Sequence, residues 1–229
     1  MKQILFLILL FAALNIFAQK EELDLRFNVK FNNEILELNK QYFLTSANDS
    51  IKIETLKFFV SDFKFLQNKT VVDSLSKKHH LIDLENDSST RLKGKRSNQL
   101  SFNKIKFNVG IDSLTNDSGV FGGDLDPTNG MYWTWQSGYI NFKLEGKSQA
   151  CPTRNNLFQF HIGGYLAPYS ALRSIELDIL NKKITLIDLD IDTFLSNINL
   201  TETHSIMSPN KTAVILADIF PKAFTIADE

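Results

Sequence analysis

Apolar residues alternate with polar ones in several stretches of this sequence, and this pattern constrains the fold more than any other feature. Residues 23–31 read LDLRFNVKF and residues 105–111 read IKFNVGI, so every second side chain is apolar. Successive side chains of a strand point to opposite faces, so each stretch buries one face only. Many of the apolar positions are among the 19 phenylalanines, which suit a half-buried sheet. The pattern predicts an all-β protein.

Two longer stretches suggest how the strands are connected. Residues 51–66 are rich in strand-forming residues but contain Ser61 and Asp62, which predict a bend or a β-bulge within one strand region. Residues 175–180 and 184–191 alternate in the same way on either side of an Asn-Lys-Lys turn. Two such strands joined by a short polar turn predict a hairpin.

The C-terminal part predicts one more element. Asp188 belongs to an alternating series of aspartates that we expect to face water. Ser208 and Pro209 have the character of a helix start and lead into residues 212–219. The architecture that we expect is a two-layer antiparallel β-sandwich with long loops and a short C-terminal helix.

The beginning of the chain has the features of a processing segment. Lys2 precedes an apolar run over residues 4–14, and small residues follow before Gln19. This predicts a signal peptide over residues 1–18 and one mature domain over residues 19–229, periplasmic or secreted. An uncleaved N-terminal anchor is the alternative. Cysteine is absent from the cleavage point, which argues against a lipid anchor, and no later stretch predicts a membrane span.

Composition and motifs narrow the function classes. A formal net charge of −1 gives no support for a nucleic-acid partner. The sequence lacks a GxSxG nucleophile elbow, an HExxH motif and a phosphate loop, so we do not expect an enzyme. Cys151 is the only cysteine, which rules out an internal disulfide and leaves an inert thiol or a soft metal ligand.

Both tryptophans fall in residues 121–146, FGGDLDPTNGMYWTWQSGYINFKLEG. The Gly/Asp/Pro/Asn loop at its start interrupts regular structure and leads into an extended segment. In such a segment Met131, Trp133 and Trp135 share one face. This face is either part of the hydrophobic core or the wall of a pocket.

The long loop over residues 112–130 carries several oxygen-bearing side chains. Asp124, Asp126 and Asn129 are candidate ligands for calcium. The loop has no later bidentate glutamate of the EF-hand kind, and Pro127 fits a proline-led turn at least as well. Calcium and a plain turn are therefore both open.

The histidines differ in their surroundings. His79 and His80 are adjacent, so they point to opposite faces and cannot chelate together, and we expect a solvated pair. His204 lies in a loop, where it caps a helix or binds a ligand.

His161 lies in a predicted strand over residues 157–162 and points away from its apolar neighbours. Gly163 and Gly164 follow at once and allow another group to approach closely. His161 is either a half-buried, hydrogen-bonded histidine or a metal ligand.

These residues together resemble a known family. The stretch from Gly123 to Tyr139 reads Gly-x-Leu-Asp-Pro-x-Asn-Gly-Met-Tyr-Trp-x-Trp-x-Ser-Gly-Tyr and is followed by FKLEG and then by FHIGG. This order of rare residues is similar to that of the MbnP-like copper-binding protein family. The supporting motif positions are Asp126, Pro127, Asn129, Gly130, Met131, Gly138, Tyr139, Gly163 and Gly164.

The resemblance implies an exported, β-rich protein with copper as cofactor. It further implies that a partner di-haem, peroxidase-like enzyme oxidises one tryptophan to kynurenine, which joins histidine ligands around Cu(I). The candidate site residues are His161, His204, Trp133 and Trp135, with no choice made between the two tryptophans. Imidazole suits copper, whereas an intact indole has a donor N–H and no lone pair to offer a metal.

Two other functions compete with copper binding. A surface module could stack a sugar or a protein partner on a tryptophan platform. That function requires two exposed, coplanar indoles with His161 remote from them. A third interpretation is purely structural, with both tryptophans in the core.

Overall fold

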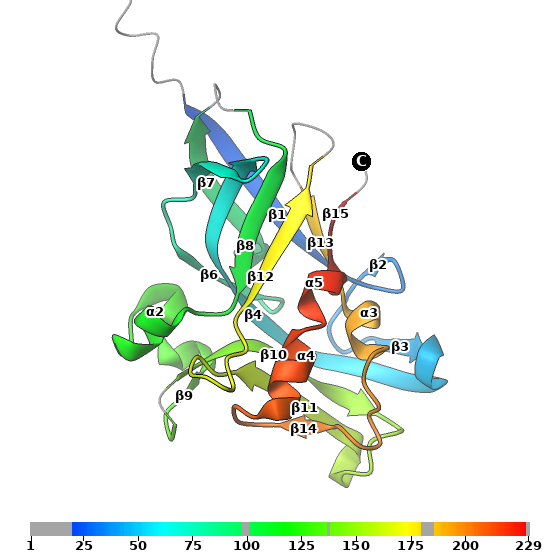
Figure 1. Ribbon diagram of the computed structural model, residues 1–229. Helices are drawn as coiled ribbons and strands as arrows, with labels where there is room; N and C mark the ends of the chain where they lie inside the picture. Colours follow the sequence, from blue (N-terminus) through cyan, green and yellow to red (C-terminus); the bar gives the residue numbers. More distant parts are fainter. Residues whose placement is uncertain (1–19, 98–100, 137, 180–185, 228–229) are drawn as a thin grey trace, which may run out of the picture.

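The computed structural model describes residues 20–97, 101–136, 138–179 and 186–227 (Figure 1). The predicted signal peptide over residues 1–18 lies outside the described residues. Fifteen strands are present: β1 (Lys20–Phe31), β2 (Glu34–Ile35), β3 (Gln41–Leu44), β4 (Asp49–Gln67), β5 (Thr70–Ser74), β6 (His79–Asp83), β7 (Arg91–Ser97), β8 (Lys104–Val109), β9 (Tyr132–Trp133), β10 (Gly138–Ser148), β11 (Leu157–Gly163), β12 (Arg173–Asp178), β13 (Leu186–Asp190), β14 (Ser205–Ile206) and β15 (Phe224–Ile226). The α-helices are α2 (Ser113–Asp117), α3 (Ile191–Leu195), α4 (Lys211–Ala217) and α5 (Phe220–Ala223).

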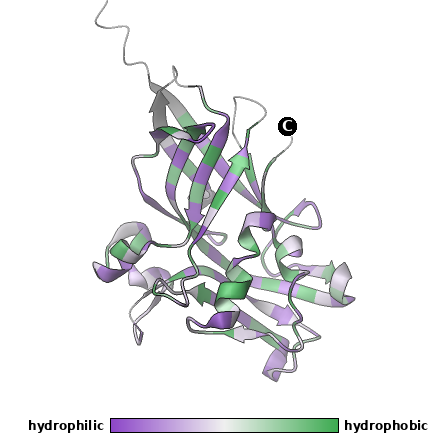
Figure 2. Cartoon of the chain, viewed as in Figure 1, coloured by the Kyte–Doolittle hydropathy of each residue, from purple (hydrophilic) through white to green (hydrophobic). Residues whose placement is uncertain are grey.

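The strands form two sheets, which confirms the predicted all-β sandwich. The smaller sheet has the order β15-β13-β1-β2, with β7 also paired to β1. The larger sheet has the order β12-β8-β4-β10-β11-β14, with β3, β5 and β6 on β4 and β9 on β10. Most pairs are antiparallel, but β1 pairs with β13 and β11 with β14 in parallel. Bands of alternating hydropathy run along β1, β4 and β8 in Figure 2.

Strand β4 links the parts of the larger sheet and contains the predicted irregularity. Asp62 has a positive φ of 52°, and the register with β8 shifts between Ser61 and Lys64. Before this point Phe58 and Val60 face the space between the sheets, and after it Phe63 does. The bulge thus changes which alternate residues point inward, so both halves of β4 contribute to one core.

Aromatic rings fill the space between the two sheets. Phe27 of β1 packs edge-on against Phe58 and Phe107 of the larger sheet, with ring centroids 6.0 and 5.7 Å apart. Phe224 of β15 joins the same group. These residues belong to one large cluster, which we call the main core.

A second, smaller cluster covers part of the opposite, outer face of the larger sheet. We call it the outer cluster; its buried members are Phe59, Leu81, Ile111, Leu125, Met131, Trp133, Tyr139 and Ile140. Phe58 and Phe59 are neighbours in β4, yet they belong to different clusters. The segments that cover the outer face are the loop between β8 and β9 and the β9–β10 hairpin.

The predicted hairpin over residues 175–191 is wrong. Strand β12 pairs with β8 in the larger sheet, whereas β13 pairs with β1 in the smaller sheet. The chain therefore crosses between layers here. Asp188, expected to face water, is buried and accepts hydrogen bonds from Asn28 and Lys30 of β1, which offset the cost of burying its charge.

The predicted C-terminal helix is present as α4, and its true N-cap is Asn210, whose side chain accepts from the Ala213 N–H. The chain then continues through α5 into β15, which pairs with β13. Among the described residues, none of the helices is long and apolar enough to cross a bilayer.

Candidate functional site

The outer face of the larger sheet carries a row of polar side chains beside the outer cluster. Register pairs Lys57 of β4 with Lys143 of β10, and Lys143 with His161 of β11. Paired residues point to the same side of a sheet, so these three lie in one row across the outer face. Two residues further along β4 and β11, the same face carries Phe59 and Gly163.

His161 is held firmly in this row. Its side chain is buried, with the residue 7% exposed, and Nε2 lies 2.6 Å from Oε1 of Glu145. This hydrogen bond lowers the pKa of the Glu145 carboxyl, against the opposing effect of burial, and Lys143 adds to the lowering. Nδ1 of His161 makes no hydrogen bond to any described residue. The imidazole is therefore oriented through one nitrogen and leaves the other for a ligand.

Trp133 lies next to His161 on the same face. A Cβ atom added to Gly163 would be 2.8 Å from Cζ3 of Trp133 and 2.6 Å from the carbonyl oxygen of Tyr139. The indole therefore lies directly over Gly163, where no larger residue fits. Gly163 and His161 are two apart in β11, so their positions on this face are roughly 6.5–7 Å apart. The predicted close approach at the glycine pair is confirmed, and the approaching group is Trp133.

The two tryptophans do not share one strand face. Strand β9 ends at Trp133, and Trp135 belongs to the turn that leads into β10. Trp133 is 5% exposed and Trp135 66%. Their ring centroids are 6.2 Å apart and the rings are tilted by 53°. The condition for a tryptophan platform, two exposed and coplanar indoles remote from His161, is therefore not met.

The Asp-Leu-Asp-Pro-Thr-Asn-Gly stretch forms two short 3₁₀ turns. Asp126 caps the second turn and accepts from the N–H and hydroxyl of Thr128, with Pro127 as its first residue. Asn129 donates to the carbonyl oxygens of Gly123 and Asp124, and Gly130 takes the left-handed conformation at φ 73°. These side chains stabilise the loop itself, which places Met131 in the outer cluster.

Asp124, the other candidate calcium ligand, ties the loop to the sheet. Its Oδ2 accepts from Nζ of Lys77 and from the N–H of Leu81 in β6. Both contacts stabilise the loop against β6 and its preceding turn. Within the described ranges, no three His, Cys, Asp or Glu side chains are grouped so that they could hold a metal ion.

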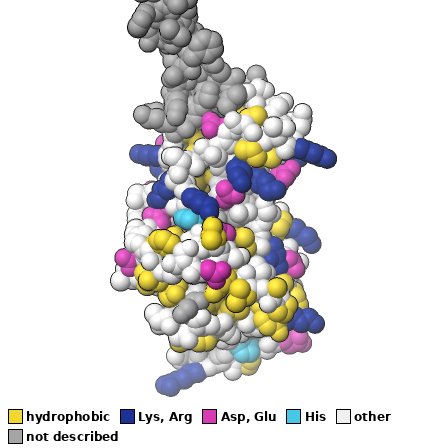
Figure 3. Space-filling model, turned by 60° about the vertical axis from the view of Figure 1, so that its left-hand side comes forward, with side chains coloured by type: hydrophobic (Ala, Val, Ile, Leu, Met, Phe, Trp, Pro, Cys, Tyr) yellow, Lys and Arg dark blue, Asp and Glu magenta, His cyan; other side chains and the backbone are white. Residues whose placement is uncertain are grey.

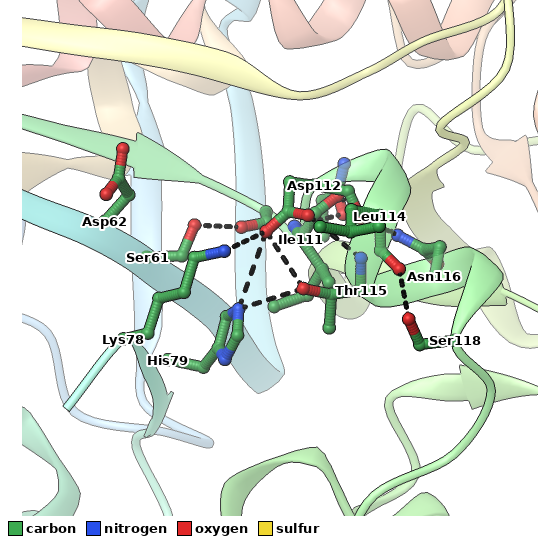
Figure 4. Close-up of polar contacts among 12 residues, drawn as sticks. Ser61, Asp62, Lys78, His79, Ile111, Asp112, Leu114, Thr115, Asn116 and Ser118 are labelled. Atoms are coloured by element: carbon green, nitrogen blue, oxygen red, sulfur yellow. Dashed lines mark hydrogen bonds and ion pairs between the residues drawn. The ribbon is translucent and has the colours of Figure 1, made fainter.

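A polar network at α2 fixes the other end of the loop (Figure 4). Asp112 caps the helix by accepting from the Thr115 N–H and pairs with Lys78 at 3.0 Å. Burial would raise the pKa of Asp112, but the Thr115 and Lys78 contacts outweigh it and bring the value to about 2. Asn116 donates to the carbonyl oxygen of Ile111 and accepts from the N–H of Tyr139 at 2.9 Å. One side chain thereby connects β8 to β10.

Two sequence-based expectations about histidines need correction. His79 is half-buried beside Asp112, and His80 is buried with Nε2 3.0 Å from the carbonyl oxygen of Lys77. Burial lowers the pKa of both side chains, with nearby lysines adding to the effect. They are not a solvated pair. Thr115 of α2 contacts His79, and His80 pairs with Val60, whose side chain belongs to the main core.

The other candidate ligands lie apart from His161. His204 immediately precedes Ser205, the first residue of β14. Ser205 pairs with Gln159, which is on the same face of β11 as His161. The preceding residue, His204, is therefore out of phase with the His161 face, on the opposite side of the strand. Its Nδ1 is buried and has no hydrogen-bond partner among the described residues. Cys151 lies in the main core, where burial raises the pKa of its thiol; this favours the inert thiol.

Sequence reasoning missed Glu145 and Asn116. Glu145 belongs to the strand that follows the tryptophan motif, but only the β10–β11 register brings it to His161. Its place at an alternate, polar position of β10 was the available signal. Asn116 had no signal of its own, because its partner Tyr139 is distant in sequence.

Comparison with known proteins bears on the family and on the fold. The sequence profile of the MbnP family matches residues 20–208. Among solved structures, MbnP from Methylosinus trichosporium is similar with a TM-score of 0.65 and 16% identity, over 86% of this chain and 88% of that one. No curated protein matches the sequence.

Proposed function

Since this chain belongs to the MbnP family, we propose that it is an exported copper-handling protein, not an enzyme, with its metal site at His161. The observation that carries the proposal is the placement of Trp133 over Gly163, beside His161 on the same outer face. One oriented imidazole and one buried indole thus lie together, away from the main core.

His161 supplies the first ligand in this proposal. Because Glu145 engages Nε2, the nitrogen left to bind copper is Nδ1. A carboxylate on the far nitrogen orients the ring and makes it a better donor, as is usual for metal-bound histidines. Glu145 is therefore a positioning residue for the site.

Trp133 supplies the second ligand after chemical change. An intact indole cannot ligate through nitrogen, so the donor set fits copper only once the ring is opened. Two molecules of hydrogen peroxide, each reduced to water, together insert two oxygen atoms and break the Cγ–Cδ1 bond, and hydrolysis of the resulting formamide releases formate. The product, kynurenine, carries an aromatic amine and a ketone. A di-haem, peroxidase-like partner would supply the oxidising equivalents. We assign the change to Trp133 because Trp135 lies in the exposed turn.

Met207 is suited to complete the site. It directly follows β14, whose last residue, Ile206, pairs with Phe160 of β11. If this parallel register continued by one residue, Met207 would be the partner of His161. A thioether is a soft ligand that favours Cu(I). Met131, the other methionine near Trp133, is buried in the outer cluster and packs there as an apolar residue.

A Cu(I) titration against a competing chelator tests the metal site. The mature protein, co-expressed with its modifying partner, is expected to bind more tightly than micromolar, and His161→Ala to lose that affinity. Glu145→Gln is expected to weaken copper binding by about 10- to 100-fold, the usual effect of losing the carboxylate that is hydrogen-bonded to a metal-binding histidine. His204→Ala is the control and should bind as wild type. Binding unchanged by His161→Ala would refute the site.

Peptide mass spectrometry of protein from native cells tests the modification separately. The expected tryptic peptide has gained one oxygen atom and lost one carbon atom, localised to Trp133. Localisation to Trp135 would move the ligand into the turn, and an unmodified peptide would exclude kynurenine from the function.

A further inference from the structure

A pocket lies beside Trp133. It is bounded by the β9–β10 hairpin, by the loop that follows β11, and by the segment before α4, and its volume is about 230 Å³. Its described lining residues are Trp133, Gln136, Gly138, Gly164, Tyr165, Leu166, Ala167, Tyr169 and Pro209. Of the residues proposed for the metal site, Trp133 lines the pocket, whereas His161 and Glu145 do not.

The walls of the pocket are preformed. Gly164 has φ 118°, and a Cβ atom there would be 2.3 Å from the carbonyl oxygen of Tyr169 and 2.9 Å from Cβ of Pro209. The loop folds back on itself through hydrogen bonds from the Ala171 N–H to Gly164 and from the Tyr169 N–H to Leu166. A pocket with walls fixed in this way needs little reordering when a ligand enters.

The chemistry of the lining selects a class of ligand. Three aromatic residues and three aliphatic ones form most of the described lining, and none of these lining side chains is charged. The polar groups are the amide of Gln136 and the hydroxyls of Tyr165 and Tyr169. A sugar would leave many hydroxyls without partners here, whereas a flat apolar ring can stack on the aromatic faces.

Trp133 adds one unpaired donor. Its Nε1 is buried and has no hydrogen-bond partner among the described residues. The benzene edge of the same ring packs on Gly163, while the residue also lines the pocket. Because this N–H has almost no accessible surface, the donors open to a ligand are those of Gln136, Tyr165 and Tyr169. A ligand with one acceptor atom matches these donors.

The surroundings of the pocket are also apolar. Trp135, Leu166, Tyr169 and Met207 are exposed large hydrophobic residues on its neighbouring segments. The region of β9, on the left in Figure 1, comes forward in Figure 3, where hydrophobic side chains gather over the lower half of the visible face. Large apolar side chains around a concave entrance favour entry of an apolar ligand.

We propose that this pocket binds a small, uncharged aromatic compound that carries one hydrogen-bond acceptor, such as a phenol, with its ring between Tyr169 and Trp133. The volume is below the roughly 300–1,000 Å³ of pockets for drug-sized ligands, so one ring with a short substituent is the expected size. A ligand this small binds with a Kd of about 0.1–1 mM.

The test uses p-cresol and the metal-free mature protein, checked by intact mass to have both tryptophans unmodified. Two tryptophans give two indole N–H signals in a nitrogen-15 correlation spectrum, and Trp135→Phe assigns them. Saturable movement of the Trp133 signal is expected, weakened at least about tenfold by Tyr169→Ala. Ile215→Ala, which alters an exposed residue of α4 outside the pocket, is the matched control and should bind as wild type.

Other probes define the class. Benzoate, which is charged, is expected to bind more weakly than p-cresol. The proposal is overturned if p-cresol gives no saturable shift up to about 10 mM, ten times the weakest expected Kd, if Tyr169→Ala binds as wild type, or if benzoate or methyl glucoside binds more tightly. No copper is added, so failure here leaves the copper titration unaffected, and the reverse also holds.

Discussion

The main core and the outer cluster are both hydrophobic, but they are stabilised in different ways. The main core lies between two sheets, and its rings pack on one another. The outer cluster is covered by a long loop and a short hairpin, which are held by Asp112, Asn116 and Asp124. The comparison indicates that the main core determines stability, while the outer cluster determines where Trp133 and its neighbours lie.

The largest expected effect comes from the neighbours Phe58 and Phe59. Phe58 packs against Phe27, Phe142 and Phe224, so Phe58→Ala should lower the free energy of unfolding by about 3–5 kcal/mol. Phe59→Ala should cost less, about 2–3 kcal/mol, because the covering loop can collapse into the space. Urea denaturation of both variants and of the wild type measures the two losses of unfolding free energy. Equal losses would show that the two clusters unfold as one equally rigid unit.

A second pair of variants replaces two glycines, Gly146 facing the main core and Gly163 facing the outer cluster. A Cβ atom at Gly146 would be 2.6 Å from Cζ of Phe158 in the main core, and one at Gly163 would meet Trp133. Alanine at either position should cost about 1–3 kcal/mol through overpacking. Only Gly163→Ala should displace the indole and alter tryptophan fluorescence. A changed emission in Gly146→Ala alone would contradict the assignment of Trp133 to the outer cluster.

The polar support of the outer cluster should depend on pH. The pKa of Asp112 falls from 3.8 to about 2 on folding, so its contribution is present above pH 3.8 and is lost as pH falls toward 2. The contribution is at most about 2 kcal/mol. Unfolding free energies of wild type and Asp112→Asn, measured from pH 6 down to about pH 2, should therefore converge at low pH. A constant difference between them would exclude this linkage.

The smallest effect is expected at Trp135. Its ring is mostly exposed in the turn, so Trp135→Ala should change the free energy of unfolding by less than about 0.5 kcal/mol. Trp133→Ala, in contrast, should cost about 2–3 kcal/mol, as for Phe59→Ala, because the covering loop and hairpin can collapse into the space. Thermal unfolding of the two variants gives the contrast directly. A large loss for Trp135→Ala would mean that the turn carries part of the outer cluster.

Much of the fold could be predicted from local patterns. Alternation in residues 23–31 and 105–111 identified β1 and β8, and Ser61-Asp62 identified the bulge in β4. The hairpin over residues 175–191 could not be predicted correctly, because alternation tells which face of a strand is buried and not which sheet it joins. Local pattern also left Asp188 on the surface, since its partners come from β1.

The sequence singled out residues of the candidate site but not their arrangement. Trp133 lies over Gly163 on the face of β11 that carries His161. Trp135 is exposed in the turn after β9, with its ring centroid 6.2 Å from that of Trp133, and His204 is out of phase with the His161 face.

The sequence by itself determined the all-β class, the bulge in β4 and the motif of the MbnP family, because each depends on residues close together in the chain. Only the tertiary structure decided that Glu145 orients His161, that Trp133 is buried over Gly163 while Trp135 is exposed, and that a pocket lies beside the indole. These facts depend on strand register and on loops that cross the outer face. Both are set by packing between distant segments, which no local pattern of residues specifies.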